Sequence, residues 1–190
     1  MPDGEINVAR LFPRAQAFAL EVGFGGGEHL AIQAQRHRQT AFIGCEPFLN
    51  GIAKLLTQVD ALKLDNVRVH AGDARDLIAR LPSDSLSSVY ILFPDPWPKL
   101  RHRKRRFIQN DTINELARVM RHGAGLRVAT DHLEYARWTL AHLMGHGGFR
   151  WTAERAVDWR QRPADWPATR YEEKALKEGR RCVYLRFLRT

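Results

Sequence analysis

The chain has 190 residues, of which 44% are hydrophobic, so it can bury a core of its own without disulfides or metal ions. Its 30 Lys and Arg outnumber 21 Asp and Glu, and the formal net charge of +9 favours a polyanion such as nucleic acid as partner. No stretch approaches the ~18 apolar residues of a membrane span, and residues 1–10 have no apolar signal-peptide region. We therefore predict a cytoplasmic protein without membrane association, whose two cysteines, Cys45 and Cys182, are free and buried.

Apolar runs alternate with segments of helical periodicity along the chain. In chain order the pattern predicts a strand over residues 17–22, a helix over 28–38, a strand over 40–45, a helix over 49–62, a strand over 67–70, a helix over 74–81, a strand over 86–93, a helix over 111–120, a strand over 125–130 and a helix over 132–143. Two further strand-like stretches, 149–157 and 181–189, lack a clear crossover helix, and an antiparallel edge pair is expected there.

This alternation predicts an α/β fold with three layers, αβα, around a mostly parallel seven-stranded sheet. The chain is expected to form one domain, 1–190, with a short N-terminal segment over 1–16 and a basic loop over 99–106. The proline-containing stretch 158–170 is expected to be mobile without a bound partner.

Three carboxylates follow three successive predicted strands. Glu21, Glu46 and Asp73 each stand at or just past a strand end. Open parallel sheets bind ligands at this edge, near the point where the strand order reverses. Taken singly, Glu46 could be a helix cap or a solvated carboxylate, and Asp73 could be the N-cap of the helix that follows it. Together the three indicate a ligand site.

A glycine-rich turn follows the first predicted strand. Gly23 and Gly25 match the start of a dinucleotide fingerprint, but Glu28 stands where its last glycine belongs. A carboxylate at this helix start would repel a pyrophosphate, so a cofactor without phosphate is the better match. S-adenosylmethionine fits, because the three carboxylates, in chain order, can receive its positive end, its ribose hydroxyls and its adenine amino group.

The segment Pro-Asp-Pro-Trp-Pro-Lys over 94–99 follows the fourth predicted strand. Three prolines at alternate positions restrict the backbone and make a stiff platform that carries Asp95. Methyl transfer depends on in-line alignment, so a rigid platform suits that reaction. The alternative is a proline-rich turn that only leaves the sheet.

Six of the eight residues from Lys99 to Arg106 are Lys or Arg. The run could be an ordinary solvated loop, but such a density beside a cofactor site would repel itself unless phosphates neutralise it. We interpret this run as a segment that binds the phosphate backbone of an RNA. Guanine N7 fits this site, since it needs no proton removed before it attacks a methyl group. Asp95 could then stabilise the cationic product or orient the base.

The chain resembles the bacterial tRNA (guanine-N7-)-methyltransferases along nearly its full length. The segment of prolines, acid and tryptophan joined to the basic run is highly specific, whereas the glycine turn is shared by many methyltransferases. The matching segments are 20–28, 44–48, 72–74, 93–106, 129–131 and 169–172, with Lys174. The resemblance implies a Rossmann-like class I methyltransferase fold with an antiparallel final strand. It also implies tRNA as substrate and 7-methylguanosine at position 46, in the variable loop, as product.

The resemblance also implies roles for single residues. Asp95 is expected to be catalytic. The expected contacts to S-adenosylmethionine are Glu21, Gly23, Gly25, Glu46, Asp73 and Asp95. The expected contacts to tRNA or guanine are Lys99, Asp131, Thr169, Arg170, Tyr171 and Glu172. Read without the resemblance, Asp131 is a helix cap and Thr169 is the N-cap of a helix.

Other functions remain open at this stage. The chain could methylate another RNA or a small molecule, or it could be an RNA-binding protein with a degenerate cofactor pocket. No metal is expected, because His142 and His146 have a suitable helical spacing but no third ligand nearby. Trp151, Trp159 and Trp166 are expected to pack in the C-terminal region, and no obligate protein partner is predicted.

Overall fold

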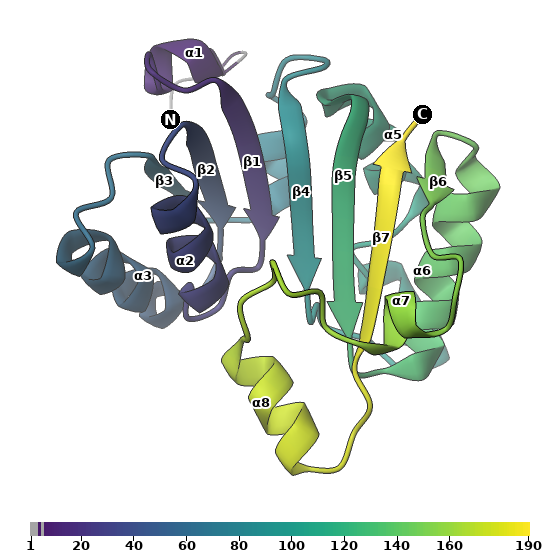
Figure 1. Cartoon of the computed structure of the whole chain (residues 1–190). Helices are drawn as coiled ribbons and strands as arrows, with labels where there is room; N and C mark the ends of the chain where they lie inside the picture. The colour runs from purple at the N-terminus through teal and green to yellow at the C-terminus, as the bar shows by residue number, and fades with distance from the viewer. Residues whose placement is uncertain (1–3, 5) are drawn as a thin grey trace.

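Seven strands form one sheet in the computed structural model, which describes residue 4 and residues 6–190. The strands are β1 (Ala17–Val22), β2 (Thr40–Cys45), β3 (Val67–His70), β4 (Leu86–Leu92), β5 (Met120–Thr130), β6 (Phe149–Trp151) and β7 (Val183–Arg189). They lie in the order β3-β2-β1-β4-β5-β7-β6 (Figure 1). The first five are parallel to one another, whereas β7 is antiparallel to both β5 and β6. The expected antiparallel C-terminal pair is confirmed.

Helices cover both faces of the sheet. They are α1 (Val8–Leu11), α2 (Glu28–Arg36), α3 (Leu49–Ala61), α4 (Ala74–Ile78), the 3-10 helix η1 (Leu100–Arg105), α5 (Asn110–Val119), α6 (Leu133–His146), α7 (Val157–Arg160) and α8 (Arg170–Lys177). One apolar cluster joins the sheet to α2, α3 and α8, and another joins its opposite face to α4, α5 and α6 (Figure 1). The three-layer α/β architecture is therefore confirmed.

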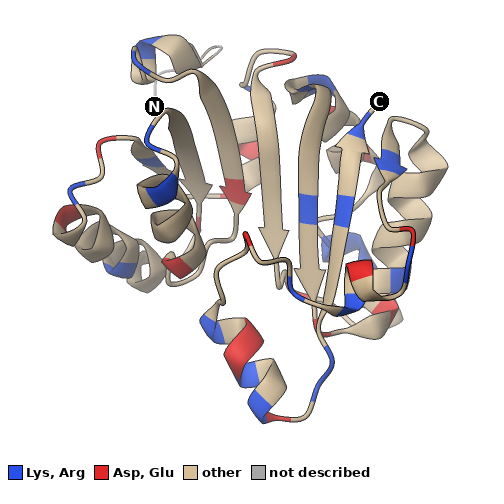
Figure 2. Ribbon diagram, in the orientation of Figure 1, with Lys and Arg blue, Asp and Glu red and all other residues tan. Residues whose placement is uncertain are grey.

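The centre of the sheet explains where a ligand can bind. β1 is followed outward by β2 on one side, and β4 begins the other half, so the strand order reverses between β1 and β4. No Lys, Arg, Asp or Glu occurs in β4, which lies between covered faces (Figure 2). The chain leaves the sheet from Val22 and from Leu92 side by side, because Val22 pairs with Ile91. The glycine turn and the proline platform therefore start next to each other.

Two predicted elements differ in the structure. The strand over 149–157 is too long, since β6 ends at Trp151. The Asp158 carboxylate accepts hydrogen bonds from the backbone N–H groups of Glu154 and Arg155, which folds this segment into a local turn before α7. The basic loop over 99–106 is also wrong as a loop, because 100–105 forms η1.

The remaining boundaries shift for local reasons. α6 continues to His146 and ends where Gly147 adopts a left-handed conformation, φ 73°. β5 starts at Met120, directly after α5, instead of at residue 125. Trp166 is 2% exposed and packs edge-on against Tyr184, as expected for a packing role. Within residue 4 and residues 6–190, no helix has the length and apolar character to cross a membrane.

Candidate active site

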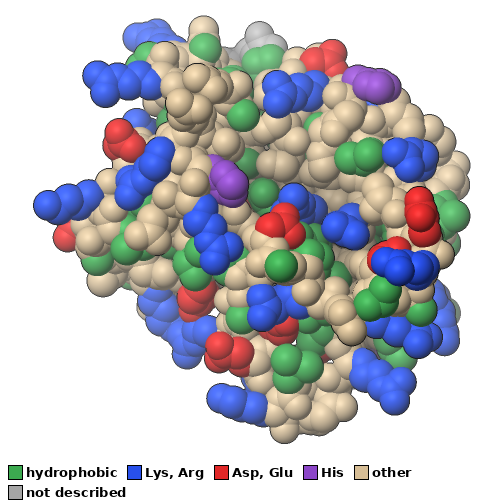
Figure 3. Space-filling view, viewed as in Figure 1, with side chains coloured by type: hydrophobic (Ala, Val, Ile, Leu, Met, Phe, Trp, Pro, Cys, Tyr) green, Lys and Arg blue, Asp and Glu red, His purple; other side chains and the backbone are tan. Residues whose placement is uncertain are grey.

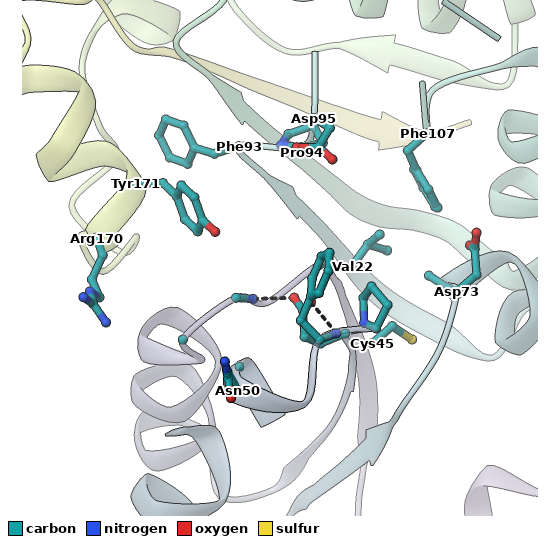
Figure 4. Close-up of a pocket in the computed structure, with 18 of the residues that line it drawn as sticks. Val22, Cys45, Asn50, Asp73, Phe93, Pro94, Asp95, Phe107, Arg170 and Tyr171 are labelled. Carbon is teal, nitrogen blue, oxygen red and sulfur yellow. Dashed lines mark hydrogen bonds between the residues drawn. The ribbon is translucent and has the colours of Figure 1, made fainter. Parts of the chain in front are cut away.

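A cavity of about 1010 Å³ opens at the carboxyl ends of the strands on both sides of the switch point. Its volume is at the upper end of the range for small-molecule sites. Its walls come from the glycine turn, the start of α3, the turn before α4, the platform after β4 and the outer face of α8. In Figure 4, Asp73 and Phe107 lie across the cavity from Arg170 and Tyr171, and Asp95 stands on its upper side.

Glu46 organises the glycine turn. Its carboxylate accepts one hydrogen bond from the Gly25 N–H at 2.9 Å and another from the Phe48 N–H at 3.0 Å, drawn as dashed lines in Figure 4. Gly25 has φ 57°, a conformation that glycine adopts without strain. Residue 51, in α3, is also a glycine, and a Cβ atom at this position would stand 2.3 Å from the Gly25 carbonyl oxygen. Glu46 and Gly51 thus let α3 pack tightly against the turn.

Glu21 occupies a different position from the one expected. Its side chain is 2% exposed and does not line the cavity. His29 Nδ1 lies 2.6 Å from the Glu21 carboxylate, and the His29 ring packs against Tyr90. The carboxylate is therefore held behind the glycine turn by the first turn of α2. A direct contact between Glu21 and a cofactor stays a prediction.

Replacing His29 with Phe is expected to lower the free energy of unfolding by about 3–5 kcal/mol, because Glu21 would keep its buried carboxylate and lose its partner. Urea unfolding followed by circular dichroism measures this. His37→Phe is the matched control, since His37 is exposed at the end of the same helix. It should change stability by no more than about 0.5 kcal/mol. Equal stability of the two variants would contradict the pairing.

Asp73 has two roles that the sequence left as alternatives. Its carboxylate caps α4 by accepting a hydrogen bond from the Arg75 N–H at 2.9 Å, and it pairs with the Arg75 guanidinium at 2.8 Å. Its side chain remains 48% exposed and lines the cavity. The N-cap interpretation is correct, and although both carboxylate oxygens contact Arg75, the exposed half of the side chain faces the cavity.

Asp95 stands on a backbone that is held under strain. Phe93 and Trp97, which flank it at equal distance along the chain, have positive φ values of 51° and 40°. Such conformations cost about 1–3 kcal/mol each for residues with side chains, so the surrounding contacts must stabilise them. Asp95 itself is exposed and lines the cavity. The platform therefore presents a free carboxylate to the cavity.

The basic run contains one residue with a different role. Arg106 is 0% exposed, so it cannot contact an RNA phosphate, and the expectation for this residue is wrong. Its guanidinium bonds the backbone of the platform instead. The exposed cations of the run are Lys99, Arg101, Lys104 and Arg105. Figure 3 shows that Lys and Arg side chains also spread over the face that carries α8, with fewer acidic groups between them.

The expected substrate residues divide into two groups. Arg170 and Tyr171 line the cavity, and Arg170 Nε lies 3.8 Å from the carboxylate of Glu28, the first residue of α2. The other four do not line the cavity: Lys99, Asp131, Thr169 and Glu172. Lys99 is exposed at the start of η1.

The structure gives three of these four residues contacts within the protein. Thr169 caps α8 by accepting from the Glu172 N–H, as its sequence position predicts. Asp131 pairs with Arg180 at 2.7 Å, while His132, not Asp131, caps α6. Glu172 is 3% exposed; it forms an ion pair with Arg162 and accepts a hydrogen bond from the Tyr184 hydroxyl. Burial and this carboxylate raise the pKa of Tyr184.

Several residues of the cavity carry no signal in the sequence pattern. Asn50, Lys54 and Phe107 line it because α3 and the segment after η1 contribute to its walls. Cys45 also reaches its inner wall, where burial raises the thiol pKa to about 12 and keeps the sulfur protonated. Apart from helical spacing in α3, these positions could not be found without the fold.

No cluster of three His, Cys, Asp or Glu suited to a metal occurs in the part of the chain that the structure describes. His142 Nδ1 lies 2.8 Å from the Trp138 carbonyl oxygen, and His146 Nε2 lies 2.8 Å from Asn114 Oδ1. The His142 contact lies within α6 itself, whereas His146 joins the end of α6 to α5.

Residues 15–185 match the model of a family described as "Putative methyltransferase". A protein from Nitrobacter hamburgensis named tRNA (guanine-N(7)-)-methyltransferase is 50% identical over 98% of this chain and 73% of its own length. A protein of the same name from Bradyrhizobium diazoefficiens is 50% identical over 97% of this chain and 78% of its own length.

Solved structures support the fold at much lower identity. The aminoglycoside resistance methyltransferase NpmB1 superposes with a TM-score of 0.61 at 18% identity, covering 96% of this chain and 92% of that one. The 16S rRNA methyltransferase KamB gives a TM-score of 0.64 at 14% identity, covering 99% and 96%. These likenesses confirm a class I methyltransferase fold. Together with half-identical relatives over most of both chains, they lead to one conclusion: the chain belongs to the tRNA (guanine-N(7)-)-methyltransferase family.

Proposed function

We propose that this chain transfers a methyl group from S-adenosylmethionine to N7 of guanosine 46 in the variable loop of tRNA. The observation that carries the proposal is a free carboxylate, Asp95, on a strained platform between the cofactor-sized cavity and a row of exposed cations. The half-identical relatives named tRNA (guanine-N(7)-)-methyltransferase support the same reaction. A binding protein without catalysis has no comparable need for this platform.

The volume of the cavity and the carboxylate acceptors that line it suit S-adenosylmethionine. Gly25 and its neighbours offer a close backbone approach, Glu46 and Asp73 offer carboxylate oxygens, and Asp95 faces the same space. In the part of the chain that the structure describes, the Asp95 carboxylate has no hydrogen bond or ion pair, so it is available for a ligand. We propose that Glu21 acts through the turn behind which it is buried, and that Gly23 contributes its backbone.

When bound, S-adenosylmethionine supplies a methyl group on a sulfonium centre. Guanine N7 carries a lone pair, so the new N–C bond forms while the C–S bond breaks, and no proton has to leave first. The methylated guanine is a cation. Asp95 can stabilise that charge as it develops, or accept hydrogen bonds from the base edge and hold N7 in line.

The tRNA is proposed to lie across the outer rim of the cavity. The exposed cations of η1 can neutralise phosphates there. Arg170 and Tyr171 reach the cavity from the opposite wall, and a tyrosine ring can stack on a base. Lys99, Asp131, Thr169 and Glu172 lie beyond the cavity wall, so contacts from them to tRNA remain proposals, and Asp131 and Glu172 would first have to exchange their ion pairs.

A methyl-transfer assay on unmodified tRNA transcripts tests the function. One transcript carries guanosine at position 46 and its matched control carries adenosine there. We expect one methyl group per tRNA, located at position 46 by nuclease digestion and mass spectrometry, and none on the control. Equal methylation of both transcripts would reject the position, and methylation only of another RNA would reject tRNA as substrate.

A further inference from the structure

Arg106 is a buried cation at the end of a row of exposed ones. The six preceding residues form η1, where Arg101, Lys104 and Arg105 are exposed, whereas the Arg106 side chain is 0% exposed. A guanidinium taken out of water is unfavourable unless its donors are satisfied by the protein. The groups that bond the Arg106 guanidinium therefore indicate its role.

The guanidinium bonds groups from two separate segments. Nε donates to the Pro96 carbonyl oxygen at 2.9 Å, and Nη2 donates to the Trp97 carbonyl oxygen at 3.3 Å. Nη1 and Nη2 both donate to the Glu134 carboxylate of α6, with Nη1 at 3.2 Å. The Trp138 ring lies 4.7 Å from the guanidinium carbon. These contacts use the planar fork of arginine, which lysine cannot reproduce.

The two bonded carbonyls belong to the residues that directly follow Asp95. Trp97 has φ 40°, a conformation that needs external support. Because Arg106 holds both carbonyl oxygens inward, the backbone of the platform is fixed against α6. The Asp95 carboxylate is left facing the cavity. Arg106 thus acts on the acid through the backbone and does not reach the cavity itself.

A second arginine links this clamp to the opposite wall. Arg75 Nη2 donates to the Arg106 carbonyl oxygen at 3.1 Å, while Arg75 Nη1 pairs with Asp73 at 2.8 Å. Arg106 is therefore joined on one side to the platform of Asp95 and on the other, through Arg75, to Asp73. One set of contacts fixes the two carboxylates relative to each other.

We propose that Arg106 is a positioning residue, whose buried guanidinium sets the location of the Asp95 carboxylate by clamping the Pro96 and Trp97 carbonyls to Glu134. The proposal rests on the role proposed for Asp95. Its experimental signature is a loss of turnover without a loss of tRNA binding. An arginine that served as a phosphate contact would give the reverse.

The test compares Arg106→Lys with Lys104→Gln in the full chain. We expect Arg106→Lys to lower kcat by 10-fold to 100-fold, with KM for tRNA and the calorimetric Kd for S-adenosylmethionine each within about threefold of the parent. Lys104→Gln, which removes an exposed cation two residues away, should raise KM for tRNA and leave kcat within about twofold. Wild-type kcat in Arg106→Lys would overturn the proposal, and so would a loss confined to KM.

A second variant covers the case in which Arg106→Lys does not fold. Glu134→Gln keeps Arg106 but weakens its anchor on a partly exposed side chain, so it should fold and lower kcat by 3-fold to 10-fold. The Arg106 hydrogen bond lowers the pKa of the Glu134 carboxyl, which agrees with a charged anchor. Unchanged kcat in folded Glu134→Gln would overturn the clamp.

A double mutant tests whether Arg106 acts through Asp95, separately from whether the proposed function is correct. If Arg106 acts through Asp95, adding Arg106→Lys to Asp95→Asn should cause less than a threefold further loss of kcat. A full, multiplicative loss in the double mutant would show that Arg106 acts independently and would overturn the proposal. Inactivity of the wild-type chain on every tRNA would instead reject the proposed function.

Discussion

Asp95→Asn is expected to lower kcat for tRNA methylation by about 10²–10³-fold, with little effect on folding. The substitution keeps the shape of the side chain and removes its charge. The Asp95 side chain is exposed in the cavity and supports no other part of the described structure, so stability should change by less than about 0.5 kcal/mol. The charge, by contrast, is what a cationic product needs beside it. Single-turnover methylation with saturating S-adenosylmethionine measures the loss.

Two control variants test whether the effect depends on a carboxylate at position 95 and not on the net charge of the protein. Asp76→Asn removes an exposed carboxylate from the first turn of α4, outside the cavity, and should retain at least half of the wild-type kcat. Asp95→Glu keeps the charge but moves it outward by one methylene group, so an intermediate loss is expected if position matters. Full turnover by Asp95→Asn, with unchanged tRNA binding, would exclude the carboxylate from catalysis.

The first three strands could be predicted residue by residue. β1, β2 and β3 match the expected ranges. β1 and β2 lie inside the sheet and are mostly apolar runs, as expected of parallel strands covered on both faces, whereas β3 at the edge alternates valine with a polar residue. The C-terminal part was less predictable. The short β6 and the turn after it depend on Asp158 capping two backbone N–H groups, and the sequence pattern does not distinguish that carboxylate from any solvated one.

In the site, too, the residues that directly follow strands could be predicted, whereas contacts between residues far apart in the sequence could not. The glycine turn, Glu46, Asp73 and Asp95 meet in one cavity because each directly follows a strand, which is a local property. The burial of Arg106 is not local. It depends on Glu134, which is 28 residues away, and nothing in a run of six cations marks the one that faces inward.

The sequence predicts the position of Glu21 in the fold but not its contact with His29. Its position at the end of β1 is as expected, yet the carboxylate is turned toward His29 in the helix that follows. Both residues are hydrophilic and flank a glycine turn, and the sequence pattern does not pair them. Only the packing of α2 on the sheet, with the His29 ring against Tyr90, shows that they satisfy each other.

Glu46→Gln is expected to weaken S-adenosylmethionine binding by about 100-fold, which corresponds to ~3 kcal/mol. The carboxylate accepts from two backbone N–H groups, one in the glycine turn and one at the start of α3. A glutamine offers one acceptor oxygen, and its NH₂ group would oppose the other N–H. One backbone donor then loses its partner at a side chain that is 5% exposed, and the turn loosens. Isothermal titration calorimetry measures the change.

Gly51→Ala tests the same turn without touching a charge. The new methyl group would stand 2.3 Å from the Gly25 carbonyl oxygen, so either α3 or the turn must shift, and the Kd for S-adenosylmethionine should rise at least tenfold. Gly145→Ala is its matched control, because Gly145 lies in α6 with open space around its Cβ position. That variant should bind the cofactor normally and gain up to about 1 kcal/mol in stability. Wild-type cofactor affinity in both Glu46→Gln and Gly51→Ala would mean that the turn held by Glu46 is not the cofactor cradle.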